Sequence, residues 1–515
     1  MGGSPIREGD GVGRWIERHA ERDGRRLALE DEDRRLDYAA LHERILRAAD
    51  VLHGVGIRRG ERVAIVSRNR SAVLETVFAA ARLGAIAVPI HARLVAREIR
   101  FLLGDCTPRA VLLDAPSQPA VREAVSALGG AAPTLLACGG DDDPWERALA
   151  AARPRERCEA SAADDPTLLL YTSGTTGQPK GALLPQRKAL ANCRNAEIFF
   201  GLTRDDRVLV ALPLFHSFGL QILSLPTLYA GGRVVLRRAF EPAAIWEDVG
   251  RLGISFFGGV PTMFRALLEA LAARPESFDL RSLRFLFTAG AAIPVELIRA
   301  FEARGLVLKQ GFGQTETSIL CCLDAQDAIR KAGSVGRPVA LAELRVVRTA
   351  TLARPPERWE QVGTGEAGEI VVRGPIVMLG YWKRPAETAE VLRDGWLRTG
   401  DLATVDAEGF LTLVGRAREL YISGGENVYP AEIEAVYAEH PAVREIAVIG
   451  VPDERWGEVG RAYVVAAPGA TLDLAALLAW GRERLAPFKL PHDFVAVAAL
   501  PRTETGKVQK HRLPR

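Results

Sequence analysis

The sequence has few cysteines, few lysines and no long apolar run, and these absences exclude several kinds of protein. Its six cysteines include no Cys-x-x-Cys pair, so neither a disulfide framework nor a paired metal or redox site is expected in a chain of 515 residues. No apolar run reaches the roughly 18 residues needed to cross a bilayer. Residues 1–15 are charged and lack the apolar centre of a signal peptide. We therefore expect a cytoplasmic protein without a transmembrane segment.

The net charge argues against two kinds of partner, and the small number of lysines draws attention to those that remain. The formal net charge is +3, which is too small to indicate a nucleic-acid or anionic membrane partner. Only eight lysines occur, and none lies in the first 179 residues, so arginine has taken most basic surface positions. A lysine that persists in such a chain points to a need for its compact ammonium group. Two of the eight, Lys180 and Lys507, lie within motifs.

The length and patterning predict an α/β fold with two domains. A chain of 515 residues exceeds one ordinary core, and apolar strands alternate with helical patterns. Residues 1–415 are predicted to form a large domain of stacked α/β subdomains with a β-rich part, in which 62–66 is a strand and 72–83 a helix. Residues 416–515 are predicted to form a small mobile α+β domain, in which Pro430 opens a helix.

The segment of residues 171–181 is the most informative part of the chain. Four Ser or Thr hydroxyls and three glycines lie within it, after a predicted buried strand and close to one lysine. Glycines let backbone N–H groups approach an anion, and hydroxyls add further donors. The Walker pattern GxxxxGK[ST] is absent, so this is a polyphosphate loop of another kind. Its candidate residues are Thr172, Ser173, Gly174, Thr175, Thr176, Gly177 and Lys180.

Three further segments place charged side chains beside glycines. Residues 306–308 predict a strand that leads into a glycine-containing turn with Glu316. Asp401 is predicted to lie in a turn, and Arg416 follows it after fourteen further residues. Each of these side chains alone is compatible with a solvated charge or a cap, and together they suggest a site.

In their order along the chain, these segments resemble the motifs of the adenylate-forming superfamily, which includes acyl-CoA synthetases, peptide-synthetase adenylation domains and luciferases. The resemblance spans residues 171–507 and implies that ATP and Mg²⁺ bind and that coenzyme A is a co-substrate. It implies that Glu316 holds Mg²⁺ and that Thr315 contacts phosphate. It further implies that Lys507 bridges the substrate carboxylate and the α-phosphate. The catalytic residues so implied are Lys180, His216, Thr315, Glu316 and Lys507.

The resemblance also assigns the remaining nucleotide contacts. It implies that the aromatic ring of Phe312 lies against adenine. The family more often has tyrosine at this position, so this chain keeps the ring but lacks the tyrosine hydroxyl. Asp401 and Arg416 hold the ribose hydroxyls, for which a carboxylate acceptor is suited. The nucleotide-binding residues implied, besides the phosphate loop, are Gly290, Ala291, Gly311, Phe312, Gly313, Thr315, Asp401, Arg416 and Lys507.

The segment around His216 bears on the acid that is activated. Its P-x-F-H pattern resembles acyl-CoA synthetases, whereas peptide-synthetase domains have aspartate at this place to pair with an amino group. A buried ammonium without such a partner is costly, so amino acids are disfavoured. A medium- or long-chain fatty acid is our first choice, and an aromatic or alicyclic acid is the next. The pocket residues implied are His216, Phe218, Gly259, Val260, Ala289, Gly290 and Gly313.

A dicarboxylic acid such as malonate would require an arginine in that pocket. Arg265 and Arg284 lie nearby in the sequence, and both are equally compatible with surface or structural roles.

The second half-reaction is implied by residues 422–430. In the family this loop lines the path of the thiol, and Gly424, Gly425 and Glu426 are the residues implied. The small domain then turns about a hinge at Arg418, where the family more often has Asp or Lys.

The sequence leaves three alternatives to a CoA ligase open. One is a ligase that passes the acyl group to a carrier protein, and another is a luciferase-like oxidase. The third is a non-catalytic nucleotide-binding relative, against which the presence of both Lys507 and Glu316 argues. The acid itself and a homodimeric state are also left open.

Overall fold

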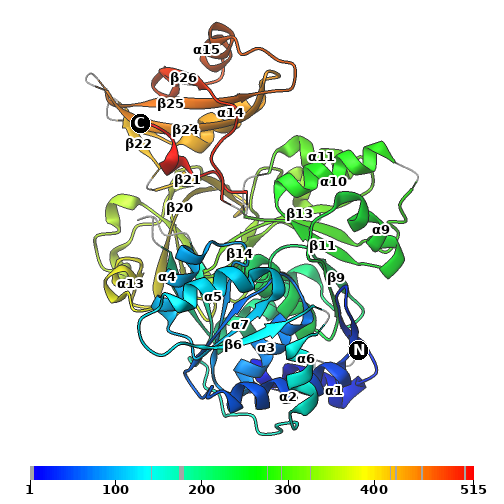
Figure 1. Cartoon of the computed structure of the whole chain (residues 1–515). Helices are drawn as coiled ribbons and strands as arrows, with labels where there is room; N and C mark the ends of the chain where they lie inside the picture. The colour runs from blue at the N-terminus through cyan, green and yellow to red at the C-terminus, as the bar shows by residue number, and fades with distance from the viewer. Residues whose placement is uncertain are drawn as a thin grey trace. The chain divides into compact units, whose positions relative to one another are not determined.

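The structure is a computed structural model that describes residues 5–7, 9–140, 142–172, 179–274, 277–290, 293–324, 326–417, 419–423, 426–453, 456–485, 487–503 and 506–515. The chain divides into two compact units (Figure 1). The first unit comprises Met1–Ala332, Pro338–Glu343 and Arg373–Leu397. The second unit comprises Gly333–Arg337, Leu344–Val372 and Arg398–Arg515. The fold is mixed α/β, with a large N-terminal and a small C-terminal domain.

One sheet of the first unit has the strand order β18-β8-β7-β4-β3-β5-β6. Strands β3 to β7 run parallel, and β8 and β18 run antiparallel to their neighbours. Two helices, α4 (Ala96–Cys106) and α5 (Gln118–Ser126), pack on this sheet through Ile99, Leu102 and Val121. The strands are β3 (Arg62–Val66), β4 (Ile86–Ile90), β5 (Ala110–Asp114), β6 (Thr134–Cys138), β7 (Pro166–Thr172), β8 (Lys180–Pro185) and β18 (Gly380–Tyr381).

A second sheet of this unit contains the strand order β14-β13-β12-β11-β9-β10-β1-β2. All neighbours from β13 to β1 are parallel, and the two ends are antiparallel hairpins. Its helices pack through Trp246, Phe264 and Phe301, and they are α9 (Pro242–Leu252), α10 (Pro261–Ala273) and α11 (Val295–Glu302). The strands are β1 (Leu27–Glu30), β2 (Arg35–Asp37), β9 (Arg207–Val210), β10 (Arg233–Leu236), β11 (Phe256–Gly259), β12 (Phe285–Thr288), β13 (Leu308–Gln314) and β14 (Ser318–Cys322).

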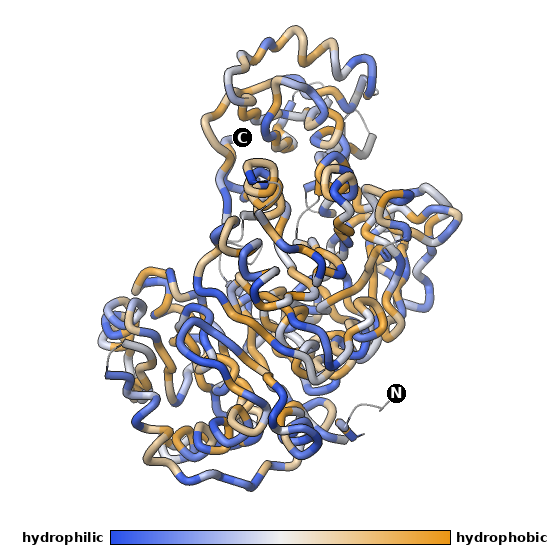
Figure 2. The backbone as a smooth tube through the Cα atoms, turned by 90° about the vertical axis from the view of Figure 1, so that its right-hand side faces the viewer, coloured by the Kyte–Doolittle hydropathy of each residue, from blue (hydrophilic) through white to orange (hydrophobic). Residues whose placement is uncertain are grey.

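Helix α3 (Ser71–Arg82) is buried along its whole length, since all twelve of its residues are inaccessible. A helix that is buried on every side belongs to the centre of a large domain. In Figure 2, apolar stretches of the chain lie mostly inside, and hydrophilic stretches lie mostly at the outer turns. Within the described residues, no helix combines the length and the apolar character that crossing a bilayer requires.

The second unit contains two small sheets. One joins β17 (Gly368–Arg373), β20 (Trp396–Val405) and β21 (Leu411–Arg416). In the other, helices α14 (Pro430–Ala438) and α15 (Leu474–Arg482) cover one face through Ile433, Tyr437 and Leu477. The strands of this second sheet are β22 (Tyr421–Ser423), β23 (Glu426–Val428), β24 (Val443–Asp453), β25 (Gly457–Ala466) and β26 (Asp493–Ala496).

Most predicted elements agree with the structure, and two predictions were wrong. Strand 62–66 coincides with β3, and helix 72–83 lies within one residue of α3. The glycine-containing segment of residues 311–313, predicted as a turn, continues strand β13, and the turn comes later, around Glu316. Asp401, also predicted in a turn, lies within strand β20, where backbone pairing with β21 extends the chain.

Candidate active site

Four neighbouring parallel strands of the first unit bring the predicted pocket segments to one edge. Parallel strands of a sheet all end on the same side, and ligands of α/β proteins bind at that side. Strands β13, β12, β11 and β9 are consecutive in the sheet. Their carboxyl ends carry residues 311–313, residues 289–290, Gly259 and the segment that reaches His216.

Close approaches at this edge explain several of the glycines. A Cβ on Gly290 would lie 3.9 Å from Cγ1 of Val260, so the ends of β12 and β11 are adjacent there. A Cβ on Gly311 would lie 2.6 Å from the ring of Phe287. The ring of Phe218 lies edge-on to that same ring, with 5.6 Å between centroids. Among the predicted pocket residues, Val260 and Gly290 are therefore adjacent, and Phe218 packs on the ring that Gly311 approaches.

His216 lies at this edge in a half-buried position. Its Nδ1 atom accepts a hydrogen bond of 3.2 Å from the backbone N–H of Phe218. The preceding ring, Phe215, packs against His91 with 4.1 Å between centroids. The backbone bond fixes the ring of His216 at the start of the helical segment that follows.

The hairpin between β13 and β14 holds Thr315 and Glu316 in a very tight turn. A Cβ on Gly313 would lie 1.8 Å from the carbonyl oxygen of Ser318, so only glycine fits. Ser318 itself has a φ of 60°, in the left-handed region that non-glycine residues rarely adopt. The hydroxyl of Thr317 accepts a hydrogen bond of 3.3 Å from the N–H of Gln314 and closes the turn.

Tyr381 brings Glu316 and Lys180 together. Its hydroxyl donates a 2.9 Å hydrogen bond to Oε1 of Glu316, and Nζ of Lys180 lies 5.5 Å from the centre of its ring. Strand β18 pairs with β8, which places Tyr381 opposite Ala182, two residues beyond Lys180. The lysine predicted for phosphate and the carboxylate predicted for Mg²⁺ thus contact one aromatic side chain.

The structure describes the two ends of the predicted phosphate loop, Thr172 and Lys180. They form the last antiparallel pair of the hairpin between β7 and β8. Thr172 in β7 pairs with Lys180 in β8, and the Thr172 hydroxyl donates a 3.4 Å hydrogen bond to the carbonyl of Lys180. The loop between them therefore begins and ends at neighbouring points of the sheet.

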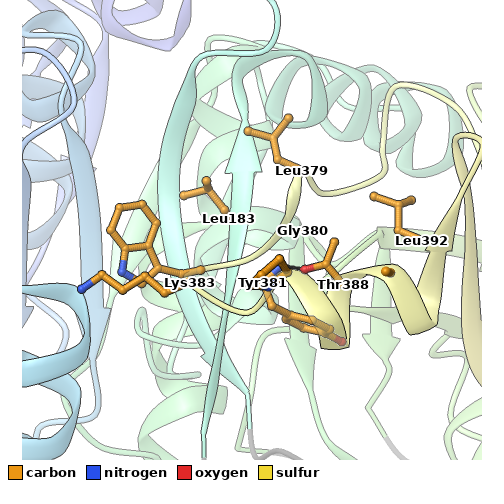
Figure 3. Close-up of a pocket in the computed structure, with 10 residues that line it drawn as sticks. Leu183, Leu379, Gly380, Tyr381, Lys383, Thr388 and Leu392 are labelled. Carbon is orange, nitrogen blue, oxygen red and sulfur yellow. Dashed lines mark hydrogen bonds between the residues drawn. The ribbon is translucent and has the colours of Figure 1, made fainter.

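A pocket of about 390 Å³ adjoins Tyr381 but contains none of the predicted acyl-pocket residues (Figure 3). Figure 3 shows the Tyr381 side chain extending away from Leu379 at the top of the view. The N–H of Tyr381 donates a 2.9 Å hydrogen bond to the hydroxyl of Thr388. The lining of the pocket is mainly apolar, and we assign no substrate to it. Its lining comprises Leu183, Leu379, Gly380, Tyr381, Trp382, Lys383, Pro385, Thr388, Ala389 and Leu392.

A fully buried lysine, Lys188, lies in helix α7 (Gln186–Phe200), directly after strand β8. Its Nζ donates a 3.1 Å hydrogen bond to Oε1 of Gln221 and a second hydrogen bond to the hydroxyl of Ser318. Burial lowers the pKa of Lys188 to about 7, and the charge of Glu316 partly opposes this shift.

In the second unit, Asp401 and Arg416 lie directly opposite each other. They are register partners of strands β20 and β21, and the guanidinium Nε of Arg416 forms an ion pair with Oδ1 of Asp401. Asp401 is buried, so its carboxylate is held in place. The two residues predicted for the ribose are thus brought together by sheet register.

Lys507, also in the second unit, lies within a small hairpin. Arg502 and Val508 form an antiparallel bridge across it. The N–H of Lys507 donates a 3.1 Å hydrogen bond to the hydroxyl of Thr503, and its carbonyl accepts a 2.7 Å hydrogen bond from the N–H of that residue. Arg502 is tied to strand β24 by a 2.9 Å ion pair with Glu445.

Lys510, three residues after Lys507, anchors the end of the chain. Its Nζ lies 2.7 Å from a carboxylate oxygen of Glu434 in α14 and 3.2 Å from one of Glu419. These carboxylates raise the pKa of Lys510 against the opposing effect of burial. The segment that carries Lys507 is therefore ion-paired to α14 and to the first described residue after position 418.

Several predicted site residues lie outside the described residues, and their roles stay predictions. Ser423 and Glu426 are register partners of the hairpin between β22 and β23, which frames the predicted thiol loop. The residues concerned are Ser173, Gly174, Thr175, Thr176, Gly177, Ala291, Arg418, Gly424 and Gly425, together with the side chain of Glu426.

Sequence reasoning missed Tyr381 and Lys188. Tyr381 lies 201 positions after Lys180 in the numbering, and Gly380 is the only glycine or hydroxyl-bearing residue within four positions of it. The only signal for Lys188 was the scarcity of lysine in the chain. Arg284, considered for a dicarboxylic acid, instead pairs with Asp206 and donates to the carbonyl of Phe200 at 3.0 Å.

Comparison with known proteins identifies related sequences along nearly the whole chain. The family described as AMP-binding enzyme matches residues 16–382, and the AMP-binding enzyme C-terminal domain matches residues 432–507. A feruloyl-CoA synthase of an Amycolatopsis species is 41% identical over 512 residues, which are 98% of this chain and 99% of that one. An indoleacetate–CoA ligase of Aromatoleum aromaticum is 40% identical over 509 residues, 96% of each chain. The crystal structure of ATP-bound MatB from Rhodopseudomonas palustris has a TM-score of 0.88 and 31% identity, covering 98% of each chain.

Proposed function

The chain belongs to the AMP-binding enzyme family and is an AMP-forming acid–CoA ligase, and from this premise we propose that its substrate is an aromatic carboxylic acid. In the first step the acid carboxylate attacks the α-phosphorus of ATP, giving acyl-AMP and pyrophosphate. In the second step the thiol of CoA attacks the acyl carbon, and AMP leaves. The thioester, AMP and pyrophosphate together account for all atoms of the acid, ATP and CoA.

The observation that carries the residue assignment is the convergence of Lys180 and Glu316 on Tyr381. We propose that Lys180 neutralises charge on the leaving phosphates while residues 172–177 donate hydrogen bonds to them, since phosphoryl-type transfer depends chiefly on positioning and charge stabilisation. One carboxylate suffices for Mg²⁺, which usually binds one or two carboxylates together with nucleotide oxygens, so Glu316 fits that ion. Bound Mg²⁺ would neutralise charge on the phosphates.

We assign the remaining roles to the pocket edge and to the second unit. Asp401 and Arg416 are proposed to hold the ribose, and Lys507 to hold the acid carboxylate beside the α-phosphate. The residues at the ends of β9, β11, β12 and β13 are proposed to enclose the acyl group and keep water away from the mixed anhydride.

Two features support an aromatic acid. The two relatives described above act, by their names, on feruloyl and indoleacetate groups, which are both aromatic. In addition, the pocket edge has small residues at Gly259, Ala289 and Gly290, with the rings of Phe218 and Phe287 nearby. Small residues leave room for a ring, and aromatic rings pack favourably edge-on or offset against another ring.

The test is pyrophosphate release and acyl-CoA mass over a panel of acids with ATP and Mg²⁺, with and without CoA. The panel contains cinnamate-type acids, benzoate and indoleacetate, a series from acetate to palmitate, and malonate. We expect thioester from the aromatic acids at a kcat/KM at least tenfold above that of the fatty acids. A preference for the fatty acids would overturn the aromatic assignment and return the first choice made from the sequence.

The same panel of acids, with oxygen uptake and ATP binding also measured, separates the alternatives. Pyrophosphate release without acyl-CoA would move the acceptor from CoA to a carrier-protein thiol. Oxygen uptake with a luciferin would indicate an oxidase, and ATP binding without pyrophosphate release from any acid would indicate a non-catalytic relative. Each of these outcomes would contradict the proposed ligase.

A further inference from the structure

Lys188, in helix α7 of the first unit, is a fully buried lysine, which is unusual for a charged side chain. Its ammonium is hydrogen-bonded to two neutral groups, Oε1 of Gln221 and the hydroxyl of Ser318. Among the residues that the structure describes, no carboxylate forms an ion pair with it. Removing an ammonium from water without an ionic partner costs free energy, and an apolar side chain of similar length would avoid that cost.

The surroundings of Lys188 on α7 show that a charge is not needed to join the segments of Gln221 and Ser318. Asn192, one helical turn after Lys188, is a buried neutral amide that donates a 2.5 Å hydrogen bond to the carbonyl of Gln221. It also accepts a 3.4 Å hydrogen bond from the N–H of Ile319, so a neutral side chain already links the same segments. A residue that lowers stability at such a place is often retained for a site, where burial and neighbours are arranged for function.

The contacts of Lys188 join three segments of the candidate active site. Helix α7, which carries it, begins directly after strand β8, whose first residue is Lys180. Gln221 belongs to the helical segment Phe218–Ser224, which follows His216, and its amide nitrogen donates a 3.1 Å hydrogen bond to Ser217. Ser318 opens strand β14, two residues after Glu316.

The hydrogen bond to Ser318 acts on a residue with a strained backbone conformation. Ser318 has a φ of 60°, and its left-handed conformation lets the chain reverse direction within the turn that carries Thr315 and Glu316. Such a conformation persists only where surrounding contacts hold it. The Ser318 hydroxyl accepts from Lys188 and donates a 3.3 Å hydrogen bond to Oε1 of Gln221, so the three side chains form a closed triangle.

We propose that Lys188 is a positioning residue of the nucleotide site, which holds Ser318 and Gln221 and thereby fixes the turn that presents Thr315 and Glu316. This inference rests on the proposed function, because it assumes that the turn serves ATP and Mg²⁺. Lys188 acts through its neighbours and touches no reacting atom.

The test compares wild type with Lys188→Met in ATP–pyrophosphate exchange, with ATP and Mg²⁺ varied separately. We expect the KM for ATP to rise about tenfold, the effect of losing one hydrogen bond to a charged group. The melting temperature should stay equal or rise, because a buried charge is removed. Thioester formation from supplied acyl-AMP should be affected less than adenylation, since that step needs neither the metal nor the β- and γ-phosphates.

A second variant and a matched control complete the design. Ser318→Ala keeps the lysine but removes its acceptor, and it should raise the KM for ATP in the same direction. Lys309→Met removes another buried lysine, which donates a 3.2 Å hydrogen bond to the carbonyl of Phe199 and lies over the rings of Phe199 and Phe285. Lys309 contacts no part of the turn, so this control should keep the wild-type KM.

Two results would overturn the inference. One is a Lys188→Met enzyme with wild-type ATP and Mg²⁺ dependence, and the other is an equal rise of KM in Lys309→Met. If wild type turns over no acid, the proposed function fails first. In that case, calorimetry of Mg·ATP binding to wild type and to Lys188→Met tests the role of Lys188 independently of turnover. Weaker binding to the variant would support the inference, and equal binding would contradict it.

Discussion

The hydroxyl of Tyr381 occupies one oxygen of Glu316, and its ring lies close to the ammonium of Lys180. Tyr381→Phe removes the hydroxyl and keeps the ring, so it isolates the hydrogen bond. A hydrogen bond to a charged group contributes about 1.5–3 kcal/mol, which predicts a loss of roughly tenfold or more in adenylation. Initial rates of pyrophosphate release at several Mg²⁺ concentrations measure this effect.

Tyr38→Phe is the matched control for that substitution. The Tyr38 side chain is buried, whereas Tyr381 is half-buried, and the Tyr38 hydroxyl donates a 2.8 Å hydrogen bond to the carbonyl of Gly232 in the same unit. Its loss should lower stability by about 1 kcal/mol and leave the Mg²⁺ dependence of adenylation unchanged. Equal adenylation rates for Tyr381→Phe and wild type would show that the Glu316 hydrogen bond is not used.

A second prediction at the residue scale concerns pH and Lys188. Burial lowers the pKa of Lys188 to about 7 from its ordinary 10.5. Between these values the unfolded chain binds a proton that the folded chain has released, so the free energy of unfolding rises with pH. The contribution is at most about 1.4 kcal/mol per pH unit and is lost as the pH falls toward 7. Lys188→Met lacks this titration, so denaturant unfolding at pH 7, 8 and 9 should show wild type gaining stability relative to the variant as the pH rises. Parallel pH dependences of the two proteins would refute it.

At the scale of elements, the hairpin of β13 and β14 depends on close backbone approach. In Gly313→Ala the new Cβ would lie 1.8 Å from the carbonyl oxygen of Ser318, and a backbone oxygen in a paired strand has little freedom to move. The hairpin must open, which we expect to cost about 1–3 kcal/mol of stability and to abolish most adenylation. Thermal unfolding and ATP–pyrophosphate exchange report the two effects.

Gly54→Ala provides the comparison for Gly313→Ala. Gly54 ends helix α2 (Tyr38–Gly54), and a Cβ there meets no atom within 4 Å. Alanine is the better helix former, so this variant should be as stable as wild type or slightly more stable. If Gly313→Ala behaves like Gly54→Ala, the tight turn is not required for the fold or for activity.

At the scale of the whole molecule, the second unit carries Lys507, and its hairpin is tied into that unit by Arg502 and Lys510. If the small domain turns between the half-reactions, as the family resemblance implies, Lys507 serves only the first of them. Lys507→Ala should therefore lower acyl-AMP formation by at least a hundredfold and largely spare thioester formation from supplied acyl-AMP. Quenched-flow assays of each half-reaction measure the two rates.

Lys489→Ala controls for the loss of a lysine in the same unit. Lys489 pairs with Glu432 and lies in a different part of the unit from the Lys507 hairpin. Both half-reactions should stay close to wild type in this variant. An equal loss in the two half-reactions of Lys507→Ala would contradict its assignment to the first step.

The sequence by itself determined the family and most of the secondary structure. The predicted phosphate loop and the motifs around Glu316, Asp401 and Lys507 are short. Their residue types predict binding of phosphate, metal, ribose and carboxylate. Strand β3 and helix α3 could be predicted because alternation and helical spacing are local properties of the chain. Residues 311–313 and Asp401 could not, because glycine and aspartate favour turns locally and only pairing with a neighbouring strand places them in a sheet.

The tertiary structure alone decided which residues meet. Tyr381 reaches Glu316 and Lys180 because β18 pairs with β8, and no spacing along the chain encodes that register. The sequence around Lys188 predicts only an ordinary helix. The role that we infer for Lys188 depends on its hydrogen bonds to Gln221 and Ser318, which come from two other segments of the chain. A motif depends on a few adjacent residues, so the sequence alone reveals it. Contacts between distant segments depend on the packing of whole sheets and helices, so only the tertiary structure reveals them.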